Sequence, residues 1–288
     1  MEYKSLGKII VDVLAARKWW NSIGISTDGT RLDEIEHYLD EVLNPTTLEA
    51  NPFRDDPLGT DAYYALSDGA GFGRIAAELS RFPSHQLPRQ TLRDVLKGSL
   101  AASKEDRDPT TDPRNEFVEL ELAAHCSAAG FSVIGFDDLK FEFEGQLYIV
   151  ECKRPSHSGT LDRNMESAYR QVRTRLGDSS ARGLVAVAVE KVFELDQRFR
   201  EVESNAECSQ FGLAIGKEFS ERVIKFQRSW LDPRVVGVVA IIRFLAKMKR
   251  PDLVAYSYQI GVVKFASEYV GQHADSQRLE RMIAALRS

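Results

Sequence analysis

The chain has 288 residues, of which 43% are hydrophobic and 28% are charged, and its formal net charge is −5. This composition is typical of a globular protein that is long enough to bury a real core. The net negative charge argues against a protein that coats nucleic acid through a general positive field, but it is compatible with an enzyme that has one local basic groove.

Apolar run lengths, the N-terminal segment and the cysteine spacing together predict the cellular location. No apolar run approaches the roughly 18 residues that a membrane helix needs, and the N-terminus lacks the layout of a signal peptide. The three cysteines, Cys126, Cys152 and Cys208, lie far apart and have no metal-ligand spacing. We therefore expect reduced thiols, a cytoplasmic location and no membrane partner.

Residues 1–108 are predicted to form a helical N-terminal region. Apolar residues recur there at helical spacing, and turns rich in Pro, Gly and Asp separate the segments. The glycine-rich stretch 69–73 lacks the preceding strand and the following Lys-Ser/Thr of a phosphate loop, so we expect a loop that leads into a helix. The charged stretch 103–109 is expected to be a linker or an exposed loop. The predicted helical segments are 9–16, 32–39, 74–81 and 91–101.

Residues 109–288 show a different pattern, which predicts an α/β core. A helix is expected from Pro113 to Ala129, with Asp112 as its N-cap and Gly130 as its C-cap. Strands are expected at 131–134, 139–143 and 147–153, then a helix at 161–176 and an all-apolar strand at 184–189 that is buried on both faces. A C-terminal extension follows, with strand-like runs at 235–244 and 253–265 and a closing helix. The fold class is thus α/β, a central mixed β-sheet flanked by helices.

The most informative segment is the predicted hairpin around Glu144-Gly145. A two-residue turn there places Asp138 opposite Glu151, and directly opposed residues share a face of the sheet. Lys153 joins them because residues i and i+2 of a strand point the same way. A three-residue loop would bring Asp137 to this face instead of Asp138.

Two adjacent carboxylates and an ammonium group are the components of a divalent-cation site. Asp138 and Glu151 would repel each other unless a cation neutralises them, and their oxygens are the hard ligands that Mg²⁺ prefers. A bound cation can produce hydroxide near neutral pH, and Lys153 can orient that water or stabilise charge on a phosphate. The constellation therefore indicates phosphodiester hydrolysis.

Asp138, the hairpin and Glu151-Cys152-Lys153 together resemble the PD-(D/E)xK nuclease superfamily, which includes restriction endonucleases and Holliday-junction resolvases. The first motif departs from the family name, because Asp137 and not Pro precedes Asp138. The resemblance extends to Glu119 on the helix before the strands, with Glu116 as the alternative, and to Gln171 on the helix after the lysine. It covers about residues 113–190.

The resemblance implies a restriction-endonuclease-like core and a set of functional residues. Asp138, Glu151, Glu119 and the backbone carbonyl of Cys152 would bind Mg²⁺ or Mn²⁺. Lys153 and Gln171 would complete the catalytic set. The nucleic acid would be held by a basic wall, for which the sequence offers Lys153, Arg154, Arg170 and Arg175.

The expected function is that of a metal-dependent nuclease, with DNA a better expectation than RNA. By analogy with the family, its role would be in restriction, repair or anti-phage defence. One alternative is a nuclease-fold protein that binds nucleic acid without cutting it, and another is a protein–protein adaptor. The sequence does not decide between endonuclease and exonuclease modes, and it is compatible with a homo-oligomer or with a defence-system partner protein.

Overall fold

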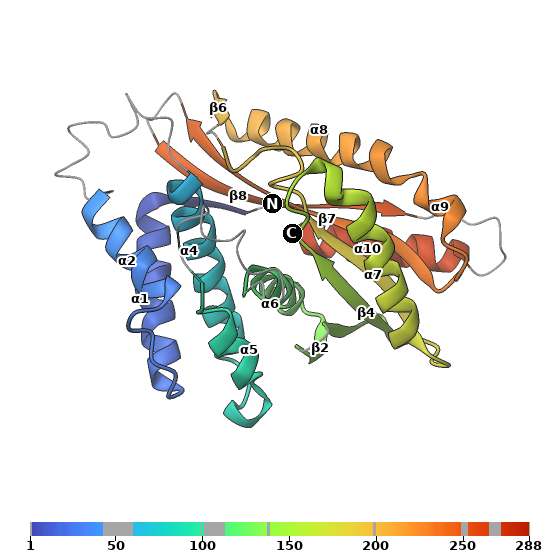
Figure 1. The fold of residues 1–288 in the computed structure, drawn as a ribbon, viewed down its shortest axis with the longest axis horizontal. Helices are drawn as coiled ribbons and strands as arrows, with labels where there is room; N and C mark the ends of the chain where they lie inside the picture. Colours follow the sequence, from blue (N-terminus) through green and yellow to red (C-terminus); the bar gives the residue numbers. More distant parts are fainter. Residues whose placement is uncertain are drawn as a thin grey trace.

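A mixed β-sheet with helices on both faces forms the centre of the protein (Figure 1). The computed structural model describes residues 2–42, 60–98, 100, 113–136, 139–197, 200–248, 253–264 and 272–287. The protein is therefore of the α/β class with a largely helical N-terminal region, as the sequence predicts. None of the helices in these ranges is both long and apolar enough to cross a membrane.

The described residues contribute eight strands to the sheet, in the order β1-β8-β7-β5-β4-β3-β2, with β6 also paired to β7. The pairs β4–β5, β5–β7 and β6–β7 are parallel, and the others are antiparallel. The strands are β1 (Glu2–Ser5), β2 (Ser132–Gly135), β3 (Lys140–Phe143), β4 (Gln146–Lys153), β5 (Arg182–Ala188), β6 (Arg200–Val202), β7 (Val235–Met248) and β8 (Leu253–Lys264).

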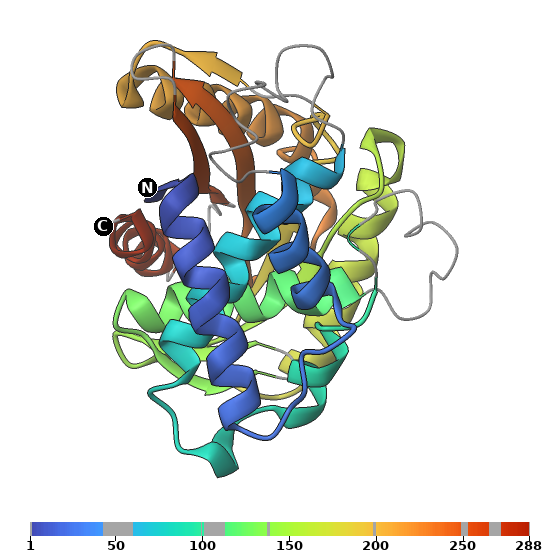
Figure 2. The same ribbon diagram turned by 90° about the vertical axis from the view of Figure 1, so that its left-hand side faces the viewer.

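The helices divide between the two faces of the sheet. On one face α1, α4, α6 and α10 pack into a single large hydrophobic cluster with the strands, and on the other face α7 and α8 form a second cluster. Figure 2 shows α1, α2 and α4 grouped on one side of the sheet. The helices are α1 (Leu6–Ser22), α2 (Arg31–Val42), α4 (Thr60–Leu79), α5 (Arg89–Asp94), α6 (Pro113–Ala128), α7 (Leu161–Leu176), α8 (Asn205–Val223), α9 (Phe226–Ser229) and α10 (Gln272–Arg287), with 3-10 turns at Ser84–Gln86 and Ser158–Thr160.

Strand β5 explains why the sheet needs both helical layers. Leu184 and Ala186 point into the cluster that contains α6, whereas Val185 and Val187 point into the cluster that contains α7. A parallel strand at the centre of a sheet is covered on both faces, and it is therefore apolar throughout. The predicted double burial of this strand is confirmed.

The β3–β4 hairpin has the predicted two-residue turn. Glu144 and Gly145 have φ values of 49° and 72°, which is the left-handed pair that a type I′ turn requires. Phe143 pairs with Gln146 and Phe141 pairs with Tyr148. The register that the sequence predicts for this hairpin is therefore confirmed over the described residues.

The N-terminal region is joined closely to the sheet. Strand β1, which the sequence did not predict, pairs with β8, and the side chains of α1 and α4 share one hydrophobic cluster with the sheet. The predicted boundary near residue 108 and the predicted linker 103–109 lie outside the described residues.

The glycine-rich stretch 69–73 is the interior of helix α4, so the expectation of a loop is wrong. The reason is close helix packing. A Cβ atom on Gly71 would lie 2.5 Å from Cζ of Phe117 on α6, and one on Gly73 would lie 2.3 Å from Cβ of Asp12 on α1. The glycines lower the intrinsic helix propensity, but they let three helices approach each other closely.

A buried charge cluster lies where these helices meet. Asp68 of α4 is within 3.3 Å of Arg114, 3.7 Å of Arg31 and 3.8 Å of Arg243. All four side chains are buried. Because an unpaired buried charge is strongly unfavourable, these ion pairs require α2, α4, α6 and β7 to keep their mutual positions.

Candidate active site

Strand β4 presents Glu151 and Lys153 on the face of the sheet that α7 covers. Ile149 packs in the cluster beside α7, while Val150 and Cys152 pack in the cluster beside α6. Alternation along the strand therefore directs Glu151 and Lys153 toward α7. The Nζ atom of Lys153 lies 2.5 Å from Oε1 of Glu151, so the two predicted residues share a face and are in direct contact.

Arg175 of α7 completes this contact. Its Nη1 atom donates to Oε2 of Glu151, so each oxygen of the carboxylate has a cationic donor. Glu151 is only 5% exposed, and a carboxylate at this depth needs such partners. We refer to Glu151, Lys153 and Arg175 as the Glu151 clamp. The sequence indicated Arg175 as a phosphate-binding residue but did not reveal its ion pair with Glu151.

The predicted partner carboxylate, Asp138, lies outside the described residues, as does the alternative Asp137. The residues beside it are informative. The backbone N–H of Val150 donates to the carbonyl of Leu139 over 2.9 Å, so the hairpin pairing continues to the residue directly after Asp138.

Glu119 of α6 reaches the same end of the hairpin. Its Oε1 atom accepts a hydrogen bond of 2.5 Å from the backbone N–H of Leu139. This contact favours Glu119 over Glu116, one turn earlier on the helix, as the helix carboxylate of the site. Helix α6 thus brings its carboxylate to the residue that follows Asp138.

Cys152 lies between the two site residues of β4 but points to the opposite face. Its thiol is buried, as expected. Burial raises its pKa well above the ordinary value, and the charges of Glu119 and Glu151 raise it further. The Cys152 carbonyl, predicted as a metal ligand, belongs to the strand segment between Glu151 and Lys153.

Gln171 and Arg170 lie on α7, one turn before the clamp arginine. Both side chains are exposed. Together with Thr174 and Arg175 they line a shallow hollow of about 230 Å³. Of these residues, Arg175 also contacts Glu151, whereas Arg170 and Gln171 have no described contact with that carboxylate.

Arg154 does not belong to this surface, so its predicted contact with nucleic acid is wrong. The Arg154 side chain points to the same face of the sheet as Val150 and Cys152, and it is buried. Its Nε atom lies 2.7 Å from Oε1 of Glu190, and its Nη2 atom donates to the Tyr64 hydroxyl over 2.8 Å. A guanidinium held in this way cannot reach a phosphodiester.

Arg154 instead belongs to a second buried polar cluster, which we call the Glu190 cluster. Arg243 of β7 donates to the same Glu190 oxygen over 2.6 Å, and the Tyr64 hydroxyl donates to Asp196 over 2.8 Å. Burial alone would raise the pKa of Glu190, but Arg243 and Arg154 outweigh it and lower the pKa to about 2. Sequence reasoning missed the cluster; the available signals were Arg243 within an apolar strand and Glu190 directly after another.

The residues that could hold a metal ion are those with hard oxygen donors at the hairpin. Within the described ranges, no group of three or more His, Cys, Asp or Glu side chains is arranged to hold one. Glu151 lies on the face of β4 that α7 covers, Glu119 reaches Leu139 from α6 on the other face, and the third predicted carboxylate, Asp138, falls in the gap at 137–138. The chemistry of these donors fits Mg²⁺ or Mn²⁺, and Lys153 and Arg175 supply positive charge at the same carboxylate.

Comparison with known proteins adds no relative: no family model, no curated protein and no solved structure matches the chain.

Proposed function

We propose that the protein is a metal-dependent nuclease that hydrolyses phosphodiester bonds, with DNA as its preferred substrate. The single observation that carries the proposal is the Glu151 clamp, a buried carboxylate between Lys153 and Arg175. The clamp lies beside Leu139, which directly follows Asp138 in the chain and whose backbone N–H donates to Glu119. A buried acid with two cations at the edge of an arginine-lined hollow is an arrangement suited to phosphate chemistry.

Each residue has a distinct role in this proposal. A Mg²⁺ or Mn²⁺ ion held by Asp138, Glu151, Glu119 and the Cys152 carbonyl would supply an acidified water and positive charge at the scissile phosphate. Lys153 holds one oxygen of Glu151 and keeps its ammonium group at the position where charge develops on the phosphate.

The helix α7 supplies the substrate side of the site. Arg175 lines the hollow together with Arg170 and Gln171. Its planar guanidinium suits bidentate contact with a phosphate. We assign Arg170 to the neighbouring phosphate of the strand and Gln171 to positioning within the hollow. Restriction, repair or anti-phage defence in the cytoplasm is the cellular role that we propose with this activity.

A second function is favoured by the same clamp. Since Lys153 and Arg175 already neutralise both oxygens of Glu151, the site is stable without a metal ion. A nuclease-fold protein that binds nucleic acid and does not cut it would show the same clamp. The two functions differ in metal binding and in product formation.

The experiment is cleavage of plasmid and of labelled oligonucleotides with Mg²⁺ or Mn²⁺, with EDTA as the metal-free control. The variants are Lys153→Ala, Glu151→Gln and Asp138→Asn. The matched control is Glu142→Gln, an exposed carboxylate on the same hairpin. We expect metal-dependent product from the wild type and the control, and losses of at least about a hundredfold in the other three.

Two outcomes would contradict the proposal. Equal product from the wild type and all variants would show that the activity does not come from this site. Binding of oligonucleotides without any product, together with an undiminished free-Mn²⁺ signal in electron paramagnetic resonance titrations, would identify the non-cutting function.

A further inference from the structure

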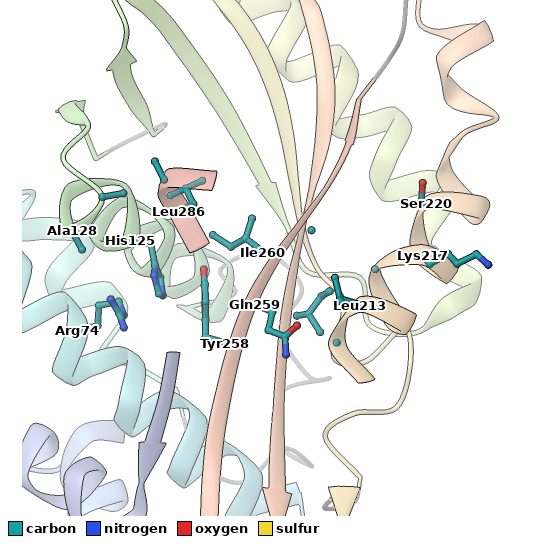
Figure 3. Close-up of a pocket in the computed structure, with 16 residues that line it drawn as sticks. Arg74, His125, Ala128, Leu213, Lys217, Ser220, Tyr258, Gln259, Ile260 and Leu286 are labelled. Atoms are coloured by element: carbon teal, nitrogen blue, oxygen red, sulfur yellow. The ribbon is translucent and has the colours of Figure 1, made fainter. Parts of the chain in front are cut away.

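A pocket of about 830 Å³ lies around strand β8, with α6 and α10 on one side and α8 on the other (Figure 3). Tyr258, Gln259 and Ile260 all line it. Since successive residues of a strand point to opposite faces, the pocket follows both sides of β8. Figure 3 shows Arg74, His125 and Tyr258 together on one side of the strand. The volume lies in the range of small-molecule binding sites.

Two polar atoms on this side have no hydrogen-bond partner among the described residues. They are Nε2 of His125 and the hydroxyl oxygen of Tyr258. Their side chains are 8% and 2% exposed, and the two rings stack with centroids 3.7 Å apart and an interplanar angle of 16°. Buried polar groups in folded proteins nearly always have a partner. Two such atoms on adjoining rings at the wall of one pocket point to a polar group of a ligand.

The charges around the two rings favour an anion. Burial lowers the pKa of His125 well below its ordinary value, and the positive charges of Arg74 and Lys4 lower it further, so the imidazole is neutral at pH 7. Arg74 lines the pocket on this side and Lys217 on the other side of β8, whereas no Asp or Glu is found in the described lining. Glu121, which acts on Tyr258, is paired with Arg243 over 3.4 Å.

The remaining wall is apolar. Ile260 of β8 and Leu286 of α10 face the space beside His125, and Ala128 and Ala285 contribute small side chains. A neutral imidazole and a phenol can each donate one hydrogen bond. This side of the pocket therefore combines two donors, one nearby guanidinium and an apolar floor.

We propose that this pocket binds a small organic carboxylate, whose charged group accepts hydrogen bonds from His125 and Tyr258 close to Arg74. Its apolar body lies against Ile260 and Leu286. The site is separate from the Glu151 clamp, since Tyr258 and its neighbours line a pocket that contains no clamp residue. The proposal is therefore independent of nuclease activity.

The test is isothermal titration calorimetry with the full chain and three probes. 1-Naphthoate carries a planar apolar body and a carboxylate, 1-naphthamide is its uncharged counterpart, and decanoate presents the same charge on an aliphatic body. We expect one or both carboxylates to bind and the amide to bind at least about tenfold more weakly. The acid that binds more tightly distinguishes an aromatic from an aliphatic ligand.

Two variants locate the binding. Tyr258→Phe removes a hydroxyl that has no described partner, so the protein should stay folded while carboxylate affinity falls by about tenfold. Ala285→Trp places an indole in the pocket, which Ala285 lines from its partly buried position on α10, and should abolish binding in the folded variant. The control is Lys225→Gln, an exposed residue paired with Asp162.

The proposal would be overturned by any of three results. The first is no heat of binding for either carboxylate at millimolar concentration. The second is binding of 1-naphthamide that is measurable and as tight as that of 1-naphthoate, which would leave only apolar adsorption. The third is unchanged carboxylate affinity in folded Tyr258→Phe and Ala285→Trp proteins, which would place the binding elsewhere.

Discussion

Replacing Glu190 by Gln should cost the protein a large part of its stability, because it removes the charge that holds two buried arginines. Arg154 and Arg243 both bind Oε1 of Glu190, at 2.7 Å and 2.6 Å. Glutamine keeps the shape of the side chain but leaves two guanidinium groups facing each other in the interior. Removing one partner of a buried ion pair typically lowers the free energy of unfolding by about 3–5 kcal/mol.

The lowered pKa of Glu190 independently indicates a loss of stability of the same size. Its value is lowered from 4.5 to about 2, and one pH unit corresponds to about 1.4 kcal/mol, so the ionised state contributes roughly 3 kcal/mol. Because the folded-state pKa lies below the unfolded one, this contribution is present above pH 4.5 and is lost as the pH falls toward 2. Glutamine does not titrate, so the difference between wild type and variant should shrink over that window.

The measurement is urea unfolding of wild type and Glu190→Gln at pH 7 and at several points between pH 5 and 2.5. The control is Glu218→Gln, which removes a 51% exposed carboxylate from a surface pair with Arg222 and should change the free energy of unfolding by less than about 1 kcal/mol. A Glu190→Gln protein within about 1 kcal/mol of the wild type at pH 7, or with an unchanged acid dependence, would refute the reasoning.

Two further predictions concern the clamp and the helix packing. Arg175→Gln removes one charged donor from the Glu151 carboxylate. It should raise Mn²⁺ affinity by roughly ten- to a hundredfold, since a hydrogen bond to a charged group contributes about 1.5–3 kcal/mol. Lower affinity in Mn²⁺ titrations would contradict this. Gly71→Ala should destabilise the protein by about 1–3 kcal/mol in urea unfolding, because the new methyl group meets Phe117. Gly7→Ala, where no atom lies within 4 Å, should instead stabilise helix α1 by roughly 0.5–1 kcal/mol, and equal effects of the two substitutions would refute the packing argument.

The local part of the site could be predicted from the sequence. Glu144-Gly145 determined the turn and the register of the hairpin, because two consecutive left-handed residues are specific to this kind of bend. Alternation then determined that Glu151 and Lys153 share a face and that Cys152 points into the core. The apolar run of β5 likewise determined a central strand with helices on both sides, and so the α/β class.

The contacts between elements were decided only by the tertiary structure. Arg154 and Arg175 are both arginines close to Glu151 in the fold, yet one is buried against Glu190 and the other binds Glu151. Local propensity predicts a loop for the glycines of α4, whereas in the folded protein they lie within a helix and leave room for Phe117 and Asp12 of the neighbouring helices. Periodicity reports which face of an element is buried, but it does not report what lies against that face. Partners of a buried charge and the spacing of packed helices depend on residues far away in the chain, so they appear only in the folded protein.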